Sequence, residues 1–207
     1  YFDKSEAAVF TGDAEVGAAF SALPFDHLLF TGGTQIGKKV MKAASENLVP
    51  VTVELGGKSP VIVDEDANLS EVAKKVMRGK TMNAGQICLA PDYLMLPKGK
   101  SKEFANASSE VIGEMFEDLK YNEDYTSVIN ERHYERINEL VADAKEKGAE
   151  VLEINPADED FEQQELHKIP PTLVLNPTDD MKIMQEEIFG PVSVSYTHLT
   201  LPTIGEV

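Results

Sequence analysis

The sequence predicts an α/β fold built on a parallel sheet. In the first half of the chain, short apolar runs that end in glycine or proline alternate with longer segments of helical spacing. The order strand, turn, helix, strand is typical of a parallel sheet whose crossovers are helices. A strongly amphipathic segment at 130–147 adds a long helix with one buried face.

The first half begins with a strand expected at HLLFTGG, residues 27–33, an apolar run that ends in two glycines. A helix is expected over TQIGKKVMKAASENL, residues 34–48, because its apolar side chains recur with helical spacing. Its buried stripe is expected at Ile36, Val40, Ala43 or Ala44, and Leu48. Two further strands are expected at PVTVEL (50–55) and SPVIVDED (59–66).

The middle of the chain predicts a helix, a strand and a second helix, at 68–86, 92–97 and 101–119. The buried stripe of the first of these helices is expected at Leu69, Val72, Ala73, Val76 and Met77.

The clearest helix of the chain follows, with Asn130 placed to cap its start and Gly148 to end it. Its stripe is expected at Tyr134, Ile137, Leu140, Val141 and Ala144. NPADEDFEQQE (155–165) is expected to be an acidic surface loop, and PPTLVLN (170–176) a strand.

Composition places the chain among globular proteins and argues against some classes of binding partner. Of 207 residues, 42% are hydrophobic and 27% charged, and the net charge is −17. This acidity argues against nucleic acid or an anionic membrane as a partner, because phosphate binding needs clustered lysine and arginine. A single cysteine allows no intramolecular disulfide and fits a reducing compartment, so we expect a cytoplasmic protein. Neither a signal peptide nor a membrane segment is expected, and no metal site is predicted.

The lone cysteine, Cys88, stands in MNAGQICLAPDY between an expected helix and an expected strand. Gly85 just before it allows a close backbone approach. Taken by itself, Cys88 fits either a small buried hydrophobic residue or a nucleophile.

Two other features are ambiguous when each is taken alone. Glu54, in VELGGKSP, ends an apolar run and is expected where water is scarce, either with an ionic partner or with a chemical role. Lys58 is interpreted as an ion-pair partner or a surface lysine. FTGGTQIG, residues 30–37, places glycines where a strand turns into a helix, which suits an anion because free N–H groups face it there.

Together these features make a catalytic set. A thiol can attack a carbonyl carbon, and a carboxylate can activate water to release the resulting thioester. A glycine turn that opens a helix can hold a dinucleotide that takes up a hydride.

Four motifs carry a resemblance to the aldehyde dehydrogenases, over about residues 10–194. FTGGTQIG resembles the family's cofactor turn, VELGGKSP its general-base motif, NAGQICLAPDY its nucleophile motif, and EEIFGPV (186–192) its late cofactor-binding motif. LAPDY and DYTSVINERHYERI are similar to the branch with the coniferyl aldehyde and class 3 enzymes.

The resemblance implies NAD- or NADP-dependent oxidation of an aldehyde to a carboxylic acid, with an aromatic or medium-chain aliphatic substrate. Cys88 would be the nucleophile, its backbone N–H would help stabilise the oxyanion, and Glu54 would be the base. Cofactor contacts are implied for Gly32, Gly33, Gly37, Leu55, Glu187 and Phe189. Many members carry serine where this chain has Gly33, so one pyrophosphate contact is expected to be lost or to pass to a backbone N–H.

The resemblance also implies the domain organisation. Residues 1–56 would be the C-terminal part of a Rossmann-type NAD(P)-binding domain and 57–194 a truncated catalytic domain. Residues 195–207, which include SYTHLTLPT, are unlike the family and are expected to be a non-native tail. The chain would then be an internal fragment, inactive alone, of a homodimeric parent. The alternative is an α/β remnant that acts only in binding or assembly.

Overall fold

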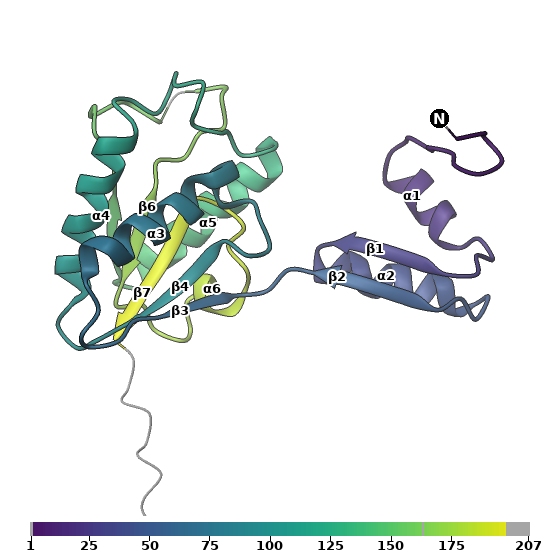
Figure 1. Ribbon diagram of the computed structural model, residues 1–207, viewed down its shortest axis with the longest axis horizontal. Helices are drawn as coiled ribbons and strands as arrows, with labels where there is room; N and C mark the ends of the chain where they lie inside the picture. Colours follow the sequence, from purple (N-terminus) through teal and green to yellow (C-terminus); the bar gives the residue numbers. More distant parts are fainter. Residues whose placement is uncertain (1, 163, 198–207) are drawn as a thin grey trace, which may run out of the picture. The chain divides into compact units, whose positions relative to one another are not determined.

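The computed structural model describes residues 2–162 and 164–197. The chain forms two compact units, Tyr1–Gly56 and Gly57–Val207, which we call unit 1 and unit 2. Both combine helices with parallel strands (Figure 1), so the predicted α/β fold class is confirmed. None of the helices in the described ranges has the length and apolar character that crossing a bilayer requires.

Unit 1 is a small βαβ arrangement preceded by a short helix. Its elements in chain order are α1 (Ala14–Ser21), β1 (Leu28–Gly32), α2 (Thr34–Ser45) and β2 (Val51–Leu55). The two strands pair in parallel, with α2 as the crossover. A small core lies between helix and strands, formed by Leu28, Val40, Ala44 and Val49.

The predicted stripe of α2 is only partly right. Val40 and Ala44 are buried, whereas Ile36 and Leu48 are 51% and 89% exposed. The helix ends at Ser45, and Leu48 lies beyond it with a φ of 58°, so its side chain no longer follows the helical periodicity.

Unit 2 contains a five-stranded sheet of order β3-β4-β7-β6-β5, parallel except for the antiparallel pair β5–β6. Its strands are β3 (Ser59–Ile62), β4 (Pro91–Leu96), β5 (Glu150–Glu153), β6 (Thr172–Leu175) and β7 (Val192–Thr197). Its helices are α3 (Leu69–Thr81), the 3-10 turn η1 (Met82–Gly85), α4 (Ser101–Met115), α5 (Glu131–Glu146) and α6 (Lys182–Gln185).

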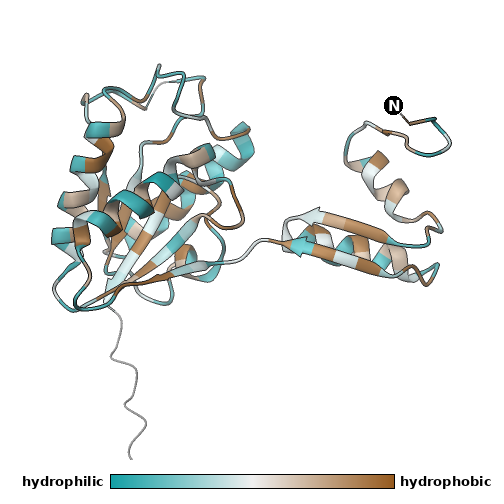
Figure 2. Cartoon of the chain, in the orientation of Figure 1, coloured by the Kyte–Doolittle hydropathy of each residue, from teal (hydrophilic) through white to brown (hydrophobic). Residues whose placement is uncertain are grey.

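Helices cover both faces of this sheet (Figure 1). Leu173 and Leu175 of β6 pack in a cluster with residues of α3 and α4, while Val174 packs in a second cluster with residues of α5 and α6. Strand β6, which lies between β7 and β5, is therefore buried along its whole length, as expected for a sheet covered on both sides. Figure 2 shows hydrophilic residues on the outer side of α3, opposite its buried stripe.

The expected strand at 92–97 and the helix at 130–147 are confirmed, with the side chains of Ile137 and Leu140 buried as predicted. The helix expected at 68–86 is right only as far as Thr81, because the backbone turns left-handed at Asn83 and Ala84. The helix expected at 101–119 ends at Met115. β5 and β7 were not predicted. β5 has only four residues with a weak pattern, and β7 overlaps the expected tail. Ser195–Thr197 pair with β4 in that strand, while the remainder of the expected tail, 198–207, lies outside the described residues.

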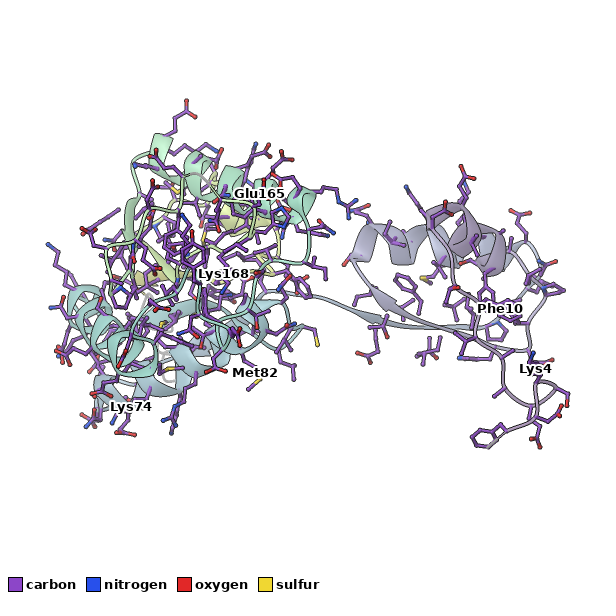
Figure 3. All side chains as sticks on the ribbon, turned by 90° about the horizontal axis from the view of Figure 1, so that it is seen from above. Lys4, Phe10, Lys74, Met82, Glu165 and Lys168 are labelled. Atoms are coloured by element: carbon purple, nitrogen blue, oxygen red, sulfur yellow. The ribbon has the colours of Figure 1, made fainter. Side chains whose placement is uncertain are left out.

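The acidic loop 155–165 is anchored to the body of unit 2. The Glu159 carboxylate accepts hydrogen bonds from the backbone N–H groups of Leu119 and Lys120. Lys168 lies among the side chains of the unit in Figure 3, whereas Lys74 lies at its edge. Just beyond the loop, the Lys168 ammonium donates to the Leu119 carbonyl at 3.1 Å, so the backbone at Leu119 is bound from two positions.

The predicted cap of α5 is confirmed, and it provides a test of the fold. The Asn130 side chain accepts a hydrogen bond from the His133 N–H at 3.0 Å. Asn130→Ala should lower the free energy of unfolding by about 1 kcal/mol, because that N–H loses its partner. The control Asn138→Ala changes an exposed position inside α5 and should be neutral or stabilising by up to about 0.5 kcal/mol. Urea unfolding would measure both, and equal losses would contradict the cap.

Candidate active site

Cys88 lies in the loop between η1 and β4, with an exposed side chain. The interpretation of Cys88 as a small buried hydrophobic residue is therefore wrong. The Ser59 hydroxyl donates to the Cys88 carbonyl at 3.2 Å, which ties this loop to β3. The Cys88 N–H donates to no described residue. A thiol and an unused N–H thus occur at one exposed position, as attack on a carbonyl requires.

The backbone just before Cys88 is strained. Asn83, Ala84 and Gly85 have φ values of 51°, 52° and 70°, and left-handed backbone is unfavourable for a residue such as alanine. Gly85 is required for a second reason. A Cβ atom at this position would lie 2.2 Å from the Gly190 carbonyl oxygen. The cysteine loop therefore packs backbone against backbone on the segment EEIFGPV.

Gln86 fixes the other side of the cysteine loop. Its side-chain amide donates to the carbonyls of Asn83 and Ser127, at 2.9 and 3.0 Å. Its side-chain oxygen accepts from the Ile129 N–H at 2.9 Å. One glutamine thereby joins the strained turn to the segment that leads into α5.

The segment that carries Glu187 follows α6 and is held by charged side chains. Lys58 pairs with Asp92, and its ammonium also donates to the carbonyls of Ile183 and Glu186 at 2.8 and 3.0 Å. The second carboxylate oxygen of Asp92 accepts from the Ile188 N–H at 2.9 Å. The interpretation of Lys58 as an ion-pair lysine agrees with these contacts.

Glu187 and Phe189 differ in exposure. Glu187 is half-buried, and desolvation raises the pKa of its carboxyl, opposed in part by a hydrogen bond from the Gly57 backbone. Phe189 is 36% exposed and has a φ of 49°, so the backbone turns sharply there. From α5, Arg136 donates to the Glu187 carbonyl at 3.2 Å and to the Ile188 carbonyl.

A second lysine is buried next to these charges. Lys80, in the last turn of α3, is 2% exposed. Desolvation lowers the pKa of its ammonium to about 8, although the carboxylates of Asp92 and Glu187 act in the opposite direction. Lys58 contributes to the lowering as a like charge. Two lysines and two carboxylates thus interact within unit 2.

The expectation that Glu54 sits where water is scarce is wrong for the described chain. In β2 the side chains of Val51, Val53 and Leu55 are half-buried, and Glu54 points to the opposite, exposed face. On that same face of the strand pair, Leu29 is 65% exposed. Strand alternation thus keeps Glu54 in contact with solvent.

The glycine turn of unit 1 suits an anionic group. Gly33 is the N-cap of α2 and forms no side-chain cap, and a Cβ there would meet no atom within 4 Å. The N–H groups of Thr34 and Gln35 donate to no described residue. At Gly37 a Cβ would lie 2.8 Å from a methyl of Leu55, so glycine lets α2 approach β2. Gly32 lies at the end of β1. The open helix N-terminus fits a dinucleotide pyrophosphate.

Sequence reasoning did not find the residues that hold the two loops in place. Gln86 and Asp92 lie within NAGQICLAPDY, and Arg136 lies within DYTSVINERHYERI. The sequence assigned none of them a role, because their roles depend on backbone groups 41–96 residues away in the chain. The available signal was their place in these two motifs and, for Gln86 and Asp92, the short distance in sequence to Cys88.

The fold and these motifs define an oxidoreductase-like α/β scaffold, and comparison with known proteins identifies the family. The model of the aldehyde dehydrogenase family matches residues 2–199. The chain therefore belongs to the aldehyde dehydrogenase family.

Curated relatives of similar sequence include enzymes named for coniferyl aldehyde. The chain is 59% identical to a probable coniferyl aldehyde dehydrogenase of Caulobacter vibrioides, over 92% of the chain and 39% of the relative. It is 52% identical to a coniferyl aldehyde dehydrogenase of a Pseudomonas species, over 93% and 40% respectively. The chain thus spans about two fifths of the length of these relatives.

Solved structures agree with the fold. The substrate-bound state of an aldehyde dehydrogenase from Staphylococcus aureus matches with a TM-score of 0.85 at 38% identity, over 96% of this chain and 42% of that one. An NADP complex of a glyceraldehyde-3-phosphate dehydrogenase from Bacillus halodurans matches with a TM-score of 0.77 at 29% identity, over 91% of this chain and 38% of that one.

The contact between Gly85 and Gly190 can be tested by adding one methyl group. Gly85→Ala should lower the free energy of unfolding by about 2–4 kcal/mol, because the new Cβ collides with a backbone oxygen at a positive φ. Gly113→Ala is the matched control. It lies within α4 with nothing near its Cβ and should stabilise by roughly 0.5–1 kcal/mol. A stable Gly85→Ala protein in urea unfolding would show that the two loops do not pack closely.

The buried Lys80 makes stability depend on pH. Below pH 8 the folded and unfolded states are both protonated and the burial cost is complete. From about 8 to 10.5 only the unfolded state still holds the proton, so stability rises with pH. Relative to Lys80→Met, the protein should gain up to about 3 kcal/mol across this range. Urea unfolding at several pH values measures the difference, and parallel profiles of the two proteins would contradict a buried charged lysine.

Proposed function

We propose that the whole protein, meaning this chain with any sequence that flanks it in its gene, oxidises an aldehyde to a carboxylic acid, with Cys88 as the nucleophile. The observation that carries this proposal is the exposed Cys88 on a strained loop, in a chain of the aldehyde dehydrogenase family. The same site favours catalysis over a purely binding or assembly role, because strain is maintained around an exposed thiol.

The Cys88 thiolate attacks the aldehyde carbon, and the C–S bond that forms gives a thiohemiacetal. The unused Cys88 N–H donates to the oxyanion that develops on the former carbonyl oxygen. Loss of hydride from the same carbon leaves a thioester on Cys88.

Glu54 is proposed as the general base of the second half of the reaction. Its carboxylate takes a proton from water, which then adds to the thioester carbon. Release of the Cys88 thiol restores the enzyme and frees the carboxylic acid. The exposed side chain of Glu54 in β2 is available for this role.

The residues present fit a nicotinamide dinucleotide. Gly32, Gly33 and the open N-terminus of α2 suit its pyrophosphate, with Gly37 and Leu55 shaping the turn. Glu187 is proposed to hold the nicotinamide ribose and Phe189 to pack near the ring. When bound, NAD or NADP supplies the hydride acceptor.

An aromatic aldehyde of the coniferyl type is the proposed substrate. Two relatives at 59% and 52% identity carry that name, which supports it over the medium-chain aliphatic alternative. A kcat/KM for coniferyl aldehyde at least tenfold above that for hexanal is the expected result.

Substitution of the two proposed catalytic residues separates the two halves of the reaction. Cys88→Ala should abolish aldehyde oxidation and hydrolysis of p-nitrophenyl acetate. Glu54→Gln should keep a burst of about one reduced nicotinamide per site and slow the following steady state by about 10²–10⁴-fold, because the thioester loses its base. Rapid-mixing absorbance at the reduced cofactor's band measures both phases.

The control is Glu71→Gln, which changes an exposed carboxylate that pairs with Lys74 on the surface of α3. It should leave burst and steady state unchanged. A burst of reduced nicotinamide in Cys88→Ala would sink the mechanism.

A further inference from the structure

Two residues to which the motifs assign no catalytic or cofactor-binding role, Lys58 and Asp92, hold the segment that carries Glu187. All three N–H donors of the Lys58 ammonium are in use, on Asp92 and on the carbonyls of Ile183 and Glu186. The Lys58 side chain is 19% exposed and that of Asp92 only 3%. A pair so shielded from water is little weakened by solvent or salt.

Asp92 links this pair to the other side of Glu187. One of its carboxylate oxygens faces Lys58, and the other accepts the Ile188 N–H at 2.9 Å. The hydrogen bonds therefore end on the residue before Glu187 and on the residue after it. Because Asp92 belongs to β4, the segment is anchored to the sheet itself.

The carboxyl of Glu187 is also bound from the same short stretch. The Gly57 backbone gives it a hydrogen bond, and Gly57 immediately precedes Lys58. Residues 57–58 thus contact both the main chain of this segment and the side chain of Glu187. Arg136 binds the Glu187 and Ile188 carbonyls from α5, so a second element supports the same turn.

Stability alone does not account for this arrangement. A buried ion pair is often no better for stability than apolar residues of similar volume. An apolar pair, however, would leave the Ile183 and Glu186 carbonyls and the Ile188 N–H without these partners. The charged side chains of Lys58 and Asp92 therefore fix the course of the backbone on both sides of Glu187.

We propose that Lys58 and Asp92 are positioning residues that hold Glu187 in the orientation needed to bind the nicotinamide cofactor. This inference rests on the proposed function for the role of Glu187. Neither residue contacts reacting atoms in this account, and both act through the backbone of 183–188. Loss of either should therefore weaken cofactor binding far more than it affects the reactivity of Cys88.

The test compares Lys58→Met with Lys74→Met in the whole protein. Lys58→Met keeps the apolar stem and removes three donors, whereas Lys74 forms only an exposed pair with Glu71 on α3. Calorimetric titration with NAD⁺ and NADP⁺ gives the Kd of each. For the cofactor that the unmodified protein binds more tightly, Lys58→Met should raise Kd by roughly 10–100-fold, as expected for lost hydrogen bonds to a charged group. Lys74→Met should leave it unchanged.

Two further readouts distinguish positioning from general damage. Hydrogen exchange at the Ile188 amide, without cofactor, should be faster by at least about tenfold in Lys58→Met. Cofactor-independent hydrolysis of p-nitrophenyl acetate should fall by no more than about threefold. Asp92→Asn keeps the volume of Asp92 and should raise Kd in the same direction if Lys58→Met fails to fold.

Failure of the positioning role and failure of the proposed function give different results. An unchanged Kd in Lys58→Met, or an equal loss of cofactor affinity and ester hydrolysis, would overturn the positioning role. If the unmodified protein oxidises no aldehyde but binds the cofactor, and Lys58→Met weakens that binding, the proposed function fails and the positioning role stands.

Discussion

The ion pair between Lys58 and Asp92 is the interaction on which the proposed site in unit 2 depends. It joins the residue before β3, the start of β4, and α6 with the segment that follows it, which are far apart in the sequence. Without it, the Glu186 carbonyl would lose the Lys58 ammonium, and the buried Ile188 N–H would lose the Asp92 carboxylate. Because desolvated partners are costly to lose, the chain is committed to one arrangement there.

A separate steric contact positions the cysteine loop against the end of this segment. Gly85 lies so close to the Gly190 carbonyl that no side chain fits, so the strained turn before Cys88 and the segment after Glu187 determine each other's position. Gln86 closes the loop from the other side. The loop with the nucleophile and the segment with Glu187 are therefore packed against each other within unit 2.

The sequence predicted the class of fold and the locations of the longer helices because periodic burial is a local property. Ile137 and Leu140 needed only their spacing, and Asn130 only its place before the helix. Strands β5 and β7 were not predicted, because their four and six residues are stabilised by neighbouring strands of the sheet. A local sequence pattern does not contain that information. For the same reason the motifs assigned roles to Cys88 and Glu187 but none to Asp92 or Arg136, whose partners are distant in the sequence. The expected burial of Glu54 failed because strand alternation, rather than the apolar residues beside it, sets the face that it occupies.

The most direct test of the central claim is to observe the covalent intermediate. The whole protein with Glu54→Gln would be mixed with coniferyl aldehyde and cofactor, quenched in acid, digested and analysed by mass spectrometry. The peptide containing Cys88 should gain the mass of the aldehyde less two hydrogen atoms, as a thioester requires. An unmodified Cys88 peptide throughout, with carboxylic acid accumulating in the same samples, would contradict it.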